Sequence, residues 1–299
     1  EKHSCTLNFF LHGLEEHFSE TLALLSQQLK GKTFQESKRL QELLKLFWSR
    51  ILAELQDGGQ HLASIRAAAG LSWKTSLDEQ WNGWQAACQW QKHKNNFRRF
   101  NNVQLPLLEE LATWLGRQSP SLATFCGGDR AWNSSTMFLD QFGTCHPTGE
   151  FQPEPDSLPT LWGRREFLPL SSDVFNCAQA FRAPSADDQR RAGLTIYAHL
   201  LSCGYLWNEI RMKAGAYGVQ AQYLPQNATL LLRSSDDPSP RQTMNTFAAL
   251  PQAGVEKNWQ DDDIRAGIIA CSKKYLLPWR PRELCQTALL QRLNAIDEN

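Results

Sequence analysis

Residues 197–223 read YAHLLSCGYLWNEIRMKAGAYGVQAQY. In the first half of this stretch, apolar residues recur at helical spacing, at Leu200, Leu201, Tyr205, Leu206 and Ile210. The second half alternates with a period of two over residues 217–223, which is typical of a strand. The stretch therefore predicts an amphipathic helix that turns directly into a strand.

The turn between these two elements is built of small residues, Lys213-Ala214-Gly215-Ala216. Glycine and alanine permit a tight turn, and glycine accepts a positive φ. Arg211 falls in the last helical turn, where a cation suits the negative end of the helix dipole, and Tyr217 opens the strand. The two side chains can face the same space and clamp an oxyanion or a backbone carbonyl. A purely structural role, with Arg211 closing a helix and Tyr217 opening a strand, remains the alternative.

Three short motifs in this stretch resemble the C-terminal signature of the presequence-protease branch of the insulinase (pitrilysin) family: Tyr205-Leu206-Trp207, Ile210-Arg211 and Ala216-Tyr217-Gly218. Ala214 stands where that signature has the first of two glycines. The resemblance implies that Arg211 and Tyr217 reach a zinc site in the other half of the enzyme. There they would bind the substrate backbone and stabilise the tetrahedral intermediate. It also implies substrate-binding positions at Gly215, Ala216 and Gly218.

The first part of the chain carries a longer and more diffuse resemblance. Residues 1 to about 112 are similar to the domain that lies between the two halves of presequence proteases. The matching pieces are Thr33-Phe34, Gly59-Gln60-His61-Leu62-Ala63 and Leu71-Ser72-Trp73. They occur in the same order as in that family, upstream of the sharper signature.

The chain is long enough for two domains of about 150 residues each. We expect a peptidase-associated domain over residues 1–143, a proline-rich linker over 144–162 and an inactive peptidase-like domain over 163–299. The expected fold class is α+β. The resemblance gives it a specific form: two similar domains of antiparallel sheet with helices packed on one face, and a long helical hairpin inserted in the first.

Periodicity and turn residues predict the individual elements. The predicted helices cover residues 13–29, about 37–57 after a capping box at 33–36, then 60–69, 76–90, 105–115, 137–142, 243–250 and most of 259–295. The predicted strands cover residues 5–11, 121–126, 167–170, 174–181, 217–223 and 228–234, the last two forming a hairpin.

Composition excludes several classes of protein. The formal net charge is +0, which argues against a general nucleic-acid or anionic-membrane surface. No apolar run approaches the roughly 20 residues that span a bilayer, and no signal peptide is visible. The 8 cysteines form no Cys-x-x-Cys pair, which favours a reducing compartment, in the cytoplasm or an organelle interior. The chain starts without Met, so we expect a piece of a longer protein.

One pattern imitates a zinc motif. His12-Gly13-Leu14-Glu15-Glu16-His17 resembles the inverted motif His-x-x-Glu-His, but its histidines are five residues apart. On a helix that spacing turns them about 140° away from each other. We therefore expect no zinc there, and at the linker pair Cys145-His146 only two of four structural ligands are present. We expect His199 to be a packed core histidine.

The resemblance implies the zinc-free C-terminal half of a zinc metalloendopeptidase that degrades short, unstructured peptides in a closed chamber. Zinc, its ligands and the general base would come from the N-terminal half of the same polypeptide, and this chain alone would be inactive. Its partners would be that half and peptide substrates. A different hypothesis is a non-catalytic peptide-binding or assembly subunit of the same family, in which Arg211 is a salt-bridge residue.

Overall fold

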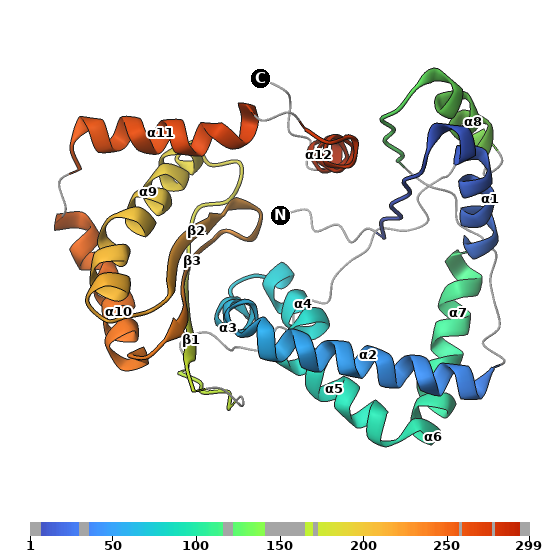
Figure 1. Cartoon of the computed structure of the whole chain (residues 1–299), viewed down its shortest axis with the longest axis horizontal. Coiled ribbons are helices and arrows are strands. Elements are labelled where there is room, and N and C mark those ends of the chain that lie inside the picture. The colour runs from blue at the N-terminus through green and yellow to red at the C-terminus, as the bar shows by residue number, and fades with distance from the viewer. Residues whose placement is uncertain are drawn as a thin grey trace. The chain divides into compact units, whose positions relative to one another are not determined.

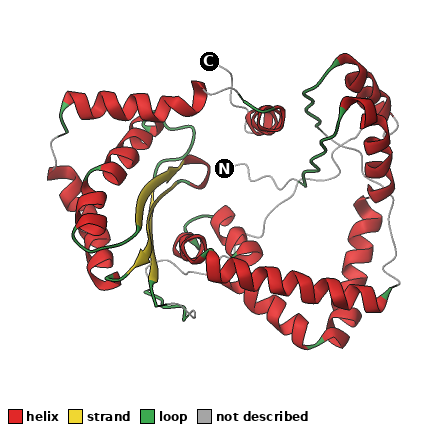
Figure 2. Cartoon of the chain, viewed as in Figure 1, coloured by secondary structure: helices red, strands yellow, loops and turns green. Residues whose placement is uncertain are grey.

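The computed structural model describes residues 7–29, 36–115, 122–140, 165–169, 173–256, 259–276 and 279–293. Helices make up most of these residues, and three strands form one antiparallel sheet (Figure 2). The α+β class is therefore confirmed. Within the described residues before position 141 there are helices and no strand, so the sheet expected in the first domain is not found there.

The N-terminal helical elements have these bounds: η1 Glu15–His17, α1 Phe18–Leu29, α2 Ser37–Asp57, α3 Gly59–Ala68, α4 Trp73–Asn82, α5 Trp84–Asn95, α6 Phe97–Arg99, η2 Phe100–Gln104, α7 Leu105–Leu115 and α8 Asp129–Asp140 (Figure 1). The predicted helices at 13–29, 60–69 and 105–115 are confirmed within two residues at each end. Helix α2 ends just before Gly58, as predicted. The capping box predicted at 33–36 includes residues 33–35, which lie outside the described part of the chain.

Two predictions in this region are wrong. The helix expected over 76–90 is two helices that break at Gly83. A side chain at Gly83 would collide with the Glu79 carboxylate, since an added Cβ would overlap Glu79 Oε2. The strands expected at 5–11 and 121–126 are irregular wherever they are described. Leu7 and Phe9 remain exposed there, because no described strand lies beside them to form a ladder.

The C-terminal elements are β1 Phe175–Arg182, α9 Arg191–Cys203, η4 Trp207–Met212, β2 Gly218–Leu224, η5 Pro225–Asn227, β3 Thr229–Asp237, α10 Pro240–Glu256, α11 Asp261–Leu276 and α12 Pro281–Leu293. The strand order is β1-β3-β2, so β2 is an edge strand. The predicted hairpin is confirmed, with a register that runs from Gly218 opposite Ser235 to Leu224 opposite Thr229. Residues 167–169 are irregular rather than a strand.

The chain forms two compact units. One combines Glu1–Leu40, Asn96–Glu154 and Leu277–Asn299, and the other combines Gln41–Asn95 with Pro155–Leu276. Each unit therefore draws on both of the domains predicted from the sequence, and the predicted boundaries stay a prediction. The predicted linker lies outside the described residues. The sheet and the stretch that opened the sequence analysis both belong to the second unit.

Helices cover both faces of the sheet within this unit (Figure 1). Elements α9, η4 and α10 pack on the face that carries Cys177, and α3 packs on the opposite face of β1 and β3. Gly59 at the start of α3 makes this approach possible, because an added Cβ would lie 2.5 Å from Asn176 Nδ2. This differs from the expectation of helices on a single face.

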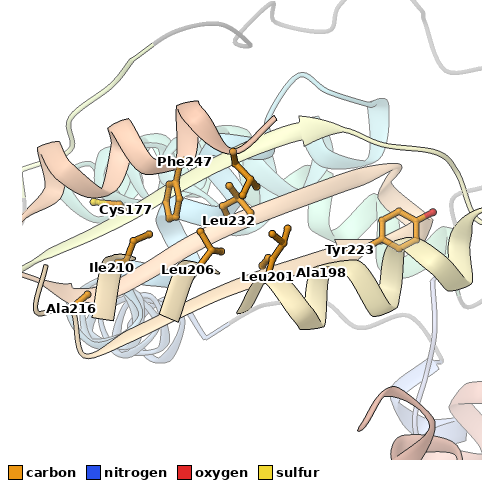
Figure 3. Close-up of a cluster of buried hydrophobic side chains, with 11 residues drawn as sticks. Cys177, Ala198, Leu201, Leu206, Ile210, Ala216, Tyr223, Leu232 and Phe247 are labelled. Carbon is orange, nitrogen blue, oxygen red and sulfur yellow. The ribbon is translucent and has the colours of Figure 1, made fainter. Parts of the chain in front are cut away.

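The core of the unit lies between the first face and its helices (Figure 3). Leu201, Leu206 and Ile210 are 0% exposed, which confirms the apolar stripe predicted for the helix. Phe247 from α10 and Leu232 from β3 are also 0% exposed and complete the cluster. This packing fixes the helix end and the start of β2 relative to each other.

Cys177 lies in this core, and burial raises the pKa of its thiol to about 11. The nearby Asp237 carboxylate, which accepts a hydrogen bond of 2.7 Å from Ser234 Oγ, raises this pKa further. At pH 8 the thiolate fraction is then roughly one in a thousand, and only the thiolate reacts with alkylating agents. We expect iodoacetamide at pH 8 to modify exposed Cys126 and Cys203 well before Cys177, as followed by mass spectrometry.

The matched control is the same labelling in concentrated urea, where all three thiols are solvated and should react at similar rates. Native labelling of Cys177 as fast as that of Cys203 would contradict its burial.

Within the described residues, no helix combines the length and apolar character needed to cross a bilayer.

Candidate functional site

The helix that carries Arg211 ends in a widened turn. Element η4 is a π-helix, and the Lys213 N–H donates to the Asn208 carbonyl at 3.1 Å, five residues back. The Gly215 N–H then donates to the Arg211 carbonyl at 3.2 Å. These bonds satisfy carbonyls that a helix end leaves without partners. Single π turns inside helices are frequent at functional sites.

The turn depends on Gly215 rather than on the position before it. Gly215 has φ +84°, whereas Ala214 is not among the described residues with positive φ. Ala214 is also buried, with 7% of its surface exposed. Alanine in place of the first glycine of the family signature therefore leaves the turn intact, because the position that needs glycine has kept it.

We expect Gly215→Ala to lower the free energy of unfolding by about 1–2 kcal/mol, because a Cβ disfavours the left-handed conformation. Space is not the cause, since the nearest atom to an added Cβ is Pro238 Cγ at 3.4 Å. Urea unfolding of the chain measures the effect. Gly215→Asn is the matched control and should cost less, because asparagine tolerates this conformation better. Equal stability of all three proteins would contradict the proposed strain.

The Arg211 guanidinium is held between two aromatic rings. Its central carbon lies 4.1 Å from the centroid of the Trp207 ring and 5.7 Å from that of Tyr217. Glu209, the nearest acid in sequence, pairs instead with Lys213 at 2.7 Å. No carboxylate of the described residues pairs with Arg211. Its N–H groups are therefore free to bind an acceptor on a ligand.

Arg211 and Tyr217 line a groove of about 670 Å³ that follows β2, the edge strand. Residues of α9 and α11 also line it, and Gln60 of α3 contributes from the other side. The whole groove lies in the second compact unit. Tyr217 is 72% exposed at this surface, so its hydroxyl is accessible to a ligand.

The free edge of β2 is partly closed by α9. Ser202 Oγ accepts a hydrogen bond of 2.8 Å from the Ala221 N–H and lies 3.0 Å from the Ala221 carbonyl oxygen. These main-chain groups of Ala221 therefore point away from β3. Because such groups alternate along an antiparallel strand, those of Val219 also point away from β3. Val219 lines the groove beside Arg211 and Tyr217, so a main-chain donor and acceptor accompany the two side chains.

The structure brings together three of the five residues implied by the family resemblance, since Arg211, Tyr217 and Gly218 line the groove. Gly215 is exposed in the adjoining turn, and Ala216 is 2% exposed with its side chain in the core. Their roles stay predictions. Sequence reasoning gave no role to Trp207 or Ser202. The spacing of four residues between Trp207 and Arg211 was the available signal for the first.

Histidines and cysteines of the described part of the chain form no metal site. Within these residues, no three His, Cys, Asp or Glu side chains gather closely enough to hold a metal ion. His12 precedes η1 and His17 lies inside it, so they share no helical face. The expectation that His199 is a core residue is wrong: it is half-buried, lines the groove and lies 3.8 Å from Cys203 Sγ. Residues 145 and 146 lie outside the described part of the chain.

Comparison with known proteins supports the resemblance. A family model described as associated with peptidases of metallopeptidase family 16, subfamily C, matches residues 1–87. The mitochondrial presequence protease of Yarrowia lipolytica is 23% identical over 280 residues, which cover 92% of this chain and 28% of that protein. That of Emericella nidulans is 25% identical over 276 residues, covering 88% and 26%. That of Gibberella zeae is 30% identical over 118 residues, covering 40% and 12%.

The predicted likeness to the C-terminal region of presequence proteases, including their middle domain, is thereby confirmed. The chain spans about a quarter of the length of the first two relatives, 28% and 26%.

Proposed function

We propose that this chain is the zinc-free C-terminal part of a zinc-dependent endopeptidase that degrades short, unstructured peptides. Similarity to presequence proteases over most of the chain supports the reaction class. The structural observation that carries the proposal is the Arg211 guanidinium, held between two rings in a groove and free of any described carboxylate. Such a group suits the carbonyl or oxyanion of a bound peptide.

In this proposal the chain binds and orients the peptide and transfers no proton. Arg211 and the Tyr217 hydroxyl donate hydrogen bonds to the carbonyl oxygen at the scissile bond, and these bonds strengthen as negative charge develops there. The outward N–H and carbonyl of Val219 can hold the backbone of an extended peptide beside them. The substrate class is therefore a peptide without folded structure, because only an extended chain can lie along a strand edge.

Zinc belongs to the other half of the enzyme in this proposal, because the described residues hold no suitable ligand cluster. When bound there, it supplies carbonyl polarisation and water activation. The partner of this chain is then the N-terminal half of the same polypeptide. The names of the relatives include "mitochondrial", which agrees with an organelle interior as one of the two compartments expected from the cysteines.

A complementation assay tests the proposal. The 299-residue chain is incubated with a fluorogenic peptide and zinc, alone and then with the separately produced N-terminal half. Cleavage should appear only in the mixture and should be abolished by a zinc chelator. If the two halves associate, zinc is bound and the peptide is still not cleaved, the assembly-subunit hypothesis replaces the enzyme hypothesis.

A further inference from the structure

The contact between Trp207 and Arg211 is the closest aromatic contact of this guanidinium, at 4.1 Å. Both residues lie on η4, one helical turn apart. Trp207 is 37% exposed and lines the groove, so its ring is at the surface that a ligand would meet. Ile210, which is 0% exposed, anchors the backbone of the same turn in the core. The indole is therefore presented from a fixed segment.

Stacking on a ring uses the flat face of a guanidinium and leaves its N–H groups at the edge. An arginine fixed by an ion pair would instead direct those N–H groups at a carboxylate. Glu209 does not offer that pairing, because Lys213 Nζ binds its Oε1 at 2.7 Å. Trp207 can thus restrict the long Arg211 side chain without occupying the donors that a peptide carbonyl needs.

We infer that Trp207 is a positioning residue, whose indole holds Arg211 in the orientation that binds the peptide. This inference deepens the proposed function and rests on it for the role of Arg211. Tyr217 supplies the second ring at 5.7 Å but is far more exposed, so it restricts Arg211 less. Trp207 itself needs no contact with the reacting atoms.

The first test needs no activity. In the chain labelled with 15N-arginine, the Nε–H resonance of Arg211 is identified by its loss in Arg211→Lys. The ring current of Trp207 should displace this resonance from the position of an exposed arginine. Trp207→Leu should return it to that position, and Trp207→Phe should leave it partly displaced. Trp81→Leu, which removes a 60% exposed tryptophan elsewhere in the unit, should not move it. An unmoved resonance in Trp207→Leu overturns the inference, whatever the enzyme does.

The second test measures peptide cleavage by the complemented enzyme. Loss of the cation–π contact in Trp207→Leu should lower kcat/KM about 3- to 30-fold. Trp207→Phe should recover most of that loss, and unfolding midpoints should stay unchanged because the side chain is exposed. In an Arg211→Ala background the same substitution should have no further effect. An equal loss in both backgrounds would show that Trp207 acts independently of Arg211 and would overturn the positioning role. If Arg211→Ala itself leaves cleavage unchanged while the resonance shifts as expected, the proposed function fails and the contact stands.

Discussion

Replacing Tyr217 with Phe in the complemented enzyme is expected to lower kcat/KM about 100- to 1000-fold, the range typical of removing one oxyanion donor. The substitution removes only a hydroxyl. The ring stays, and with it the aromatic contact to Arg211 at 5.7 Å. Because Tyr217 is 72% exposed, stability should not change. The loss should appear in kcat more than in KM, because the hydrogen bond strengthens in the transition state.

Tyr205→Phe is the matched control for this substitution. Tyr205 packs against the same core but does not line the groove of Arg211. Its hydroxyl should therefore contribute little to cleavage. An unchanged kcat/KM in Tyr217→Phe, or an equal loss in both variants, would remove Tyr217 from the mechanism.

The largest expected effect on stability comes from Phe247→Ala in α10. Phe247 is 0% exposed and packs against the cluster formed by η4, α9 and the sheet (Figure 3). Truncating a buried phenylalanine removes its transfer free energy and leaves a cavity, so the free energy of unfolding should fall by about 3–5 kcal/mol. Urea unfolding, followed by far-ultraviolet circular dichroism, measures the loss.

Ile269→Ala on α11 serves as the control, because that side chain is 72% exposed. Its effect should stay within about 0.5 kcal/mol. A loss below about 1 kcal/mol for Phe247→Ala would mean that this cluster is not the core of the unit. Since the cluster also holds Ile210, Phe247→Ala should also loosen the turn that carries Arg211.

Local patterns predicted the C-terminal elements well. The stretch 197–223 contains its own helix periodicity, a glycine at the turn and an alternating strand, and the following turn directs the chain back beside it. Each of these signals acts over a few residues, so no distant contact is needed to read them. The residue that φ +84° requires to be glycine, Gly215, was visible in the same way.

Features that depend on distant residues were missed. Helix α3 lies against β1 and β3, more than a hundred residues later, and no periodicity in residues 60–69 announces that partner. The break at Gly83 depends on the buried Glu79 carboxylate, which also accepts a hydrogen bond of 2.9 Å from Arg66. The strands predicted at 5–11 and 121–126 had the expected composition, but a strand also needs a neighbour to pair with.

The candidate site was predicted in part. Arg211 and Tyr217 were identified through the family resemblance, and the groove that they share is a tertiary feature. Trp207 stood in the same motif, but its role depends on a side-chain stack that sequence alone does not specify. Ser202 reaches the edge of β2 only because α9 packs across that strand.

The central claim is that Arg211 and Tyr217 bind the scissile carbonyl more tightly as it becomes tetrahedral. The most direct test is the affinity of the complemented enzyme for a phosphinic peptide, whose tetrahedral phosphorus replaces the scissile carbon. Tyr217→Phe should weaken this analogue by the same factor as kcat/KM, while the Kd of the uncleaved peptide stays nearly constant. An analogue that binds wild type and Tyr217→Phe equally well would contradict the claim.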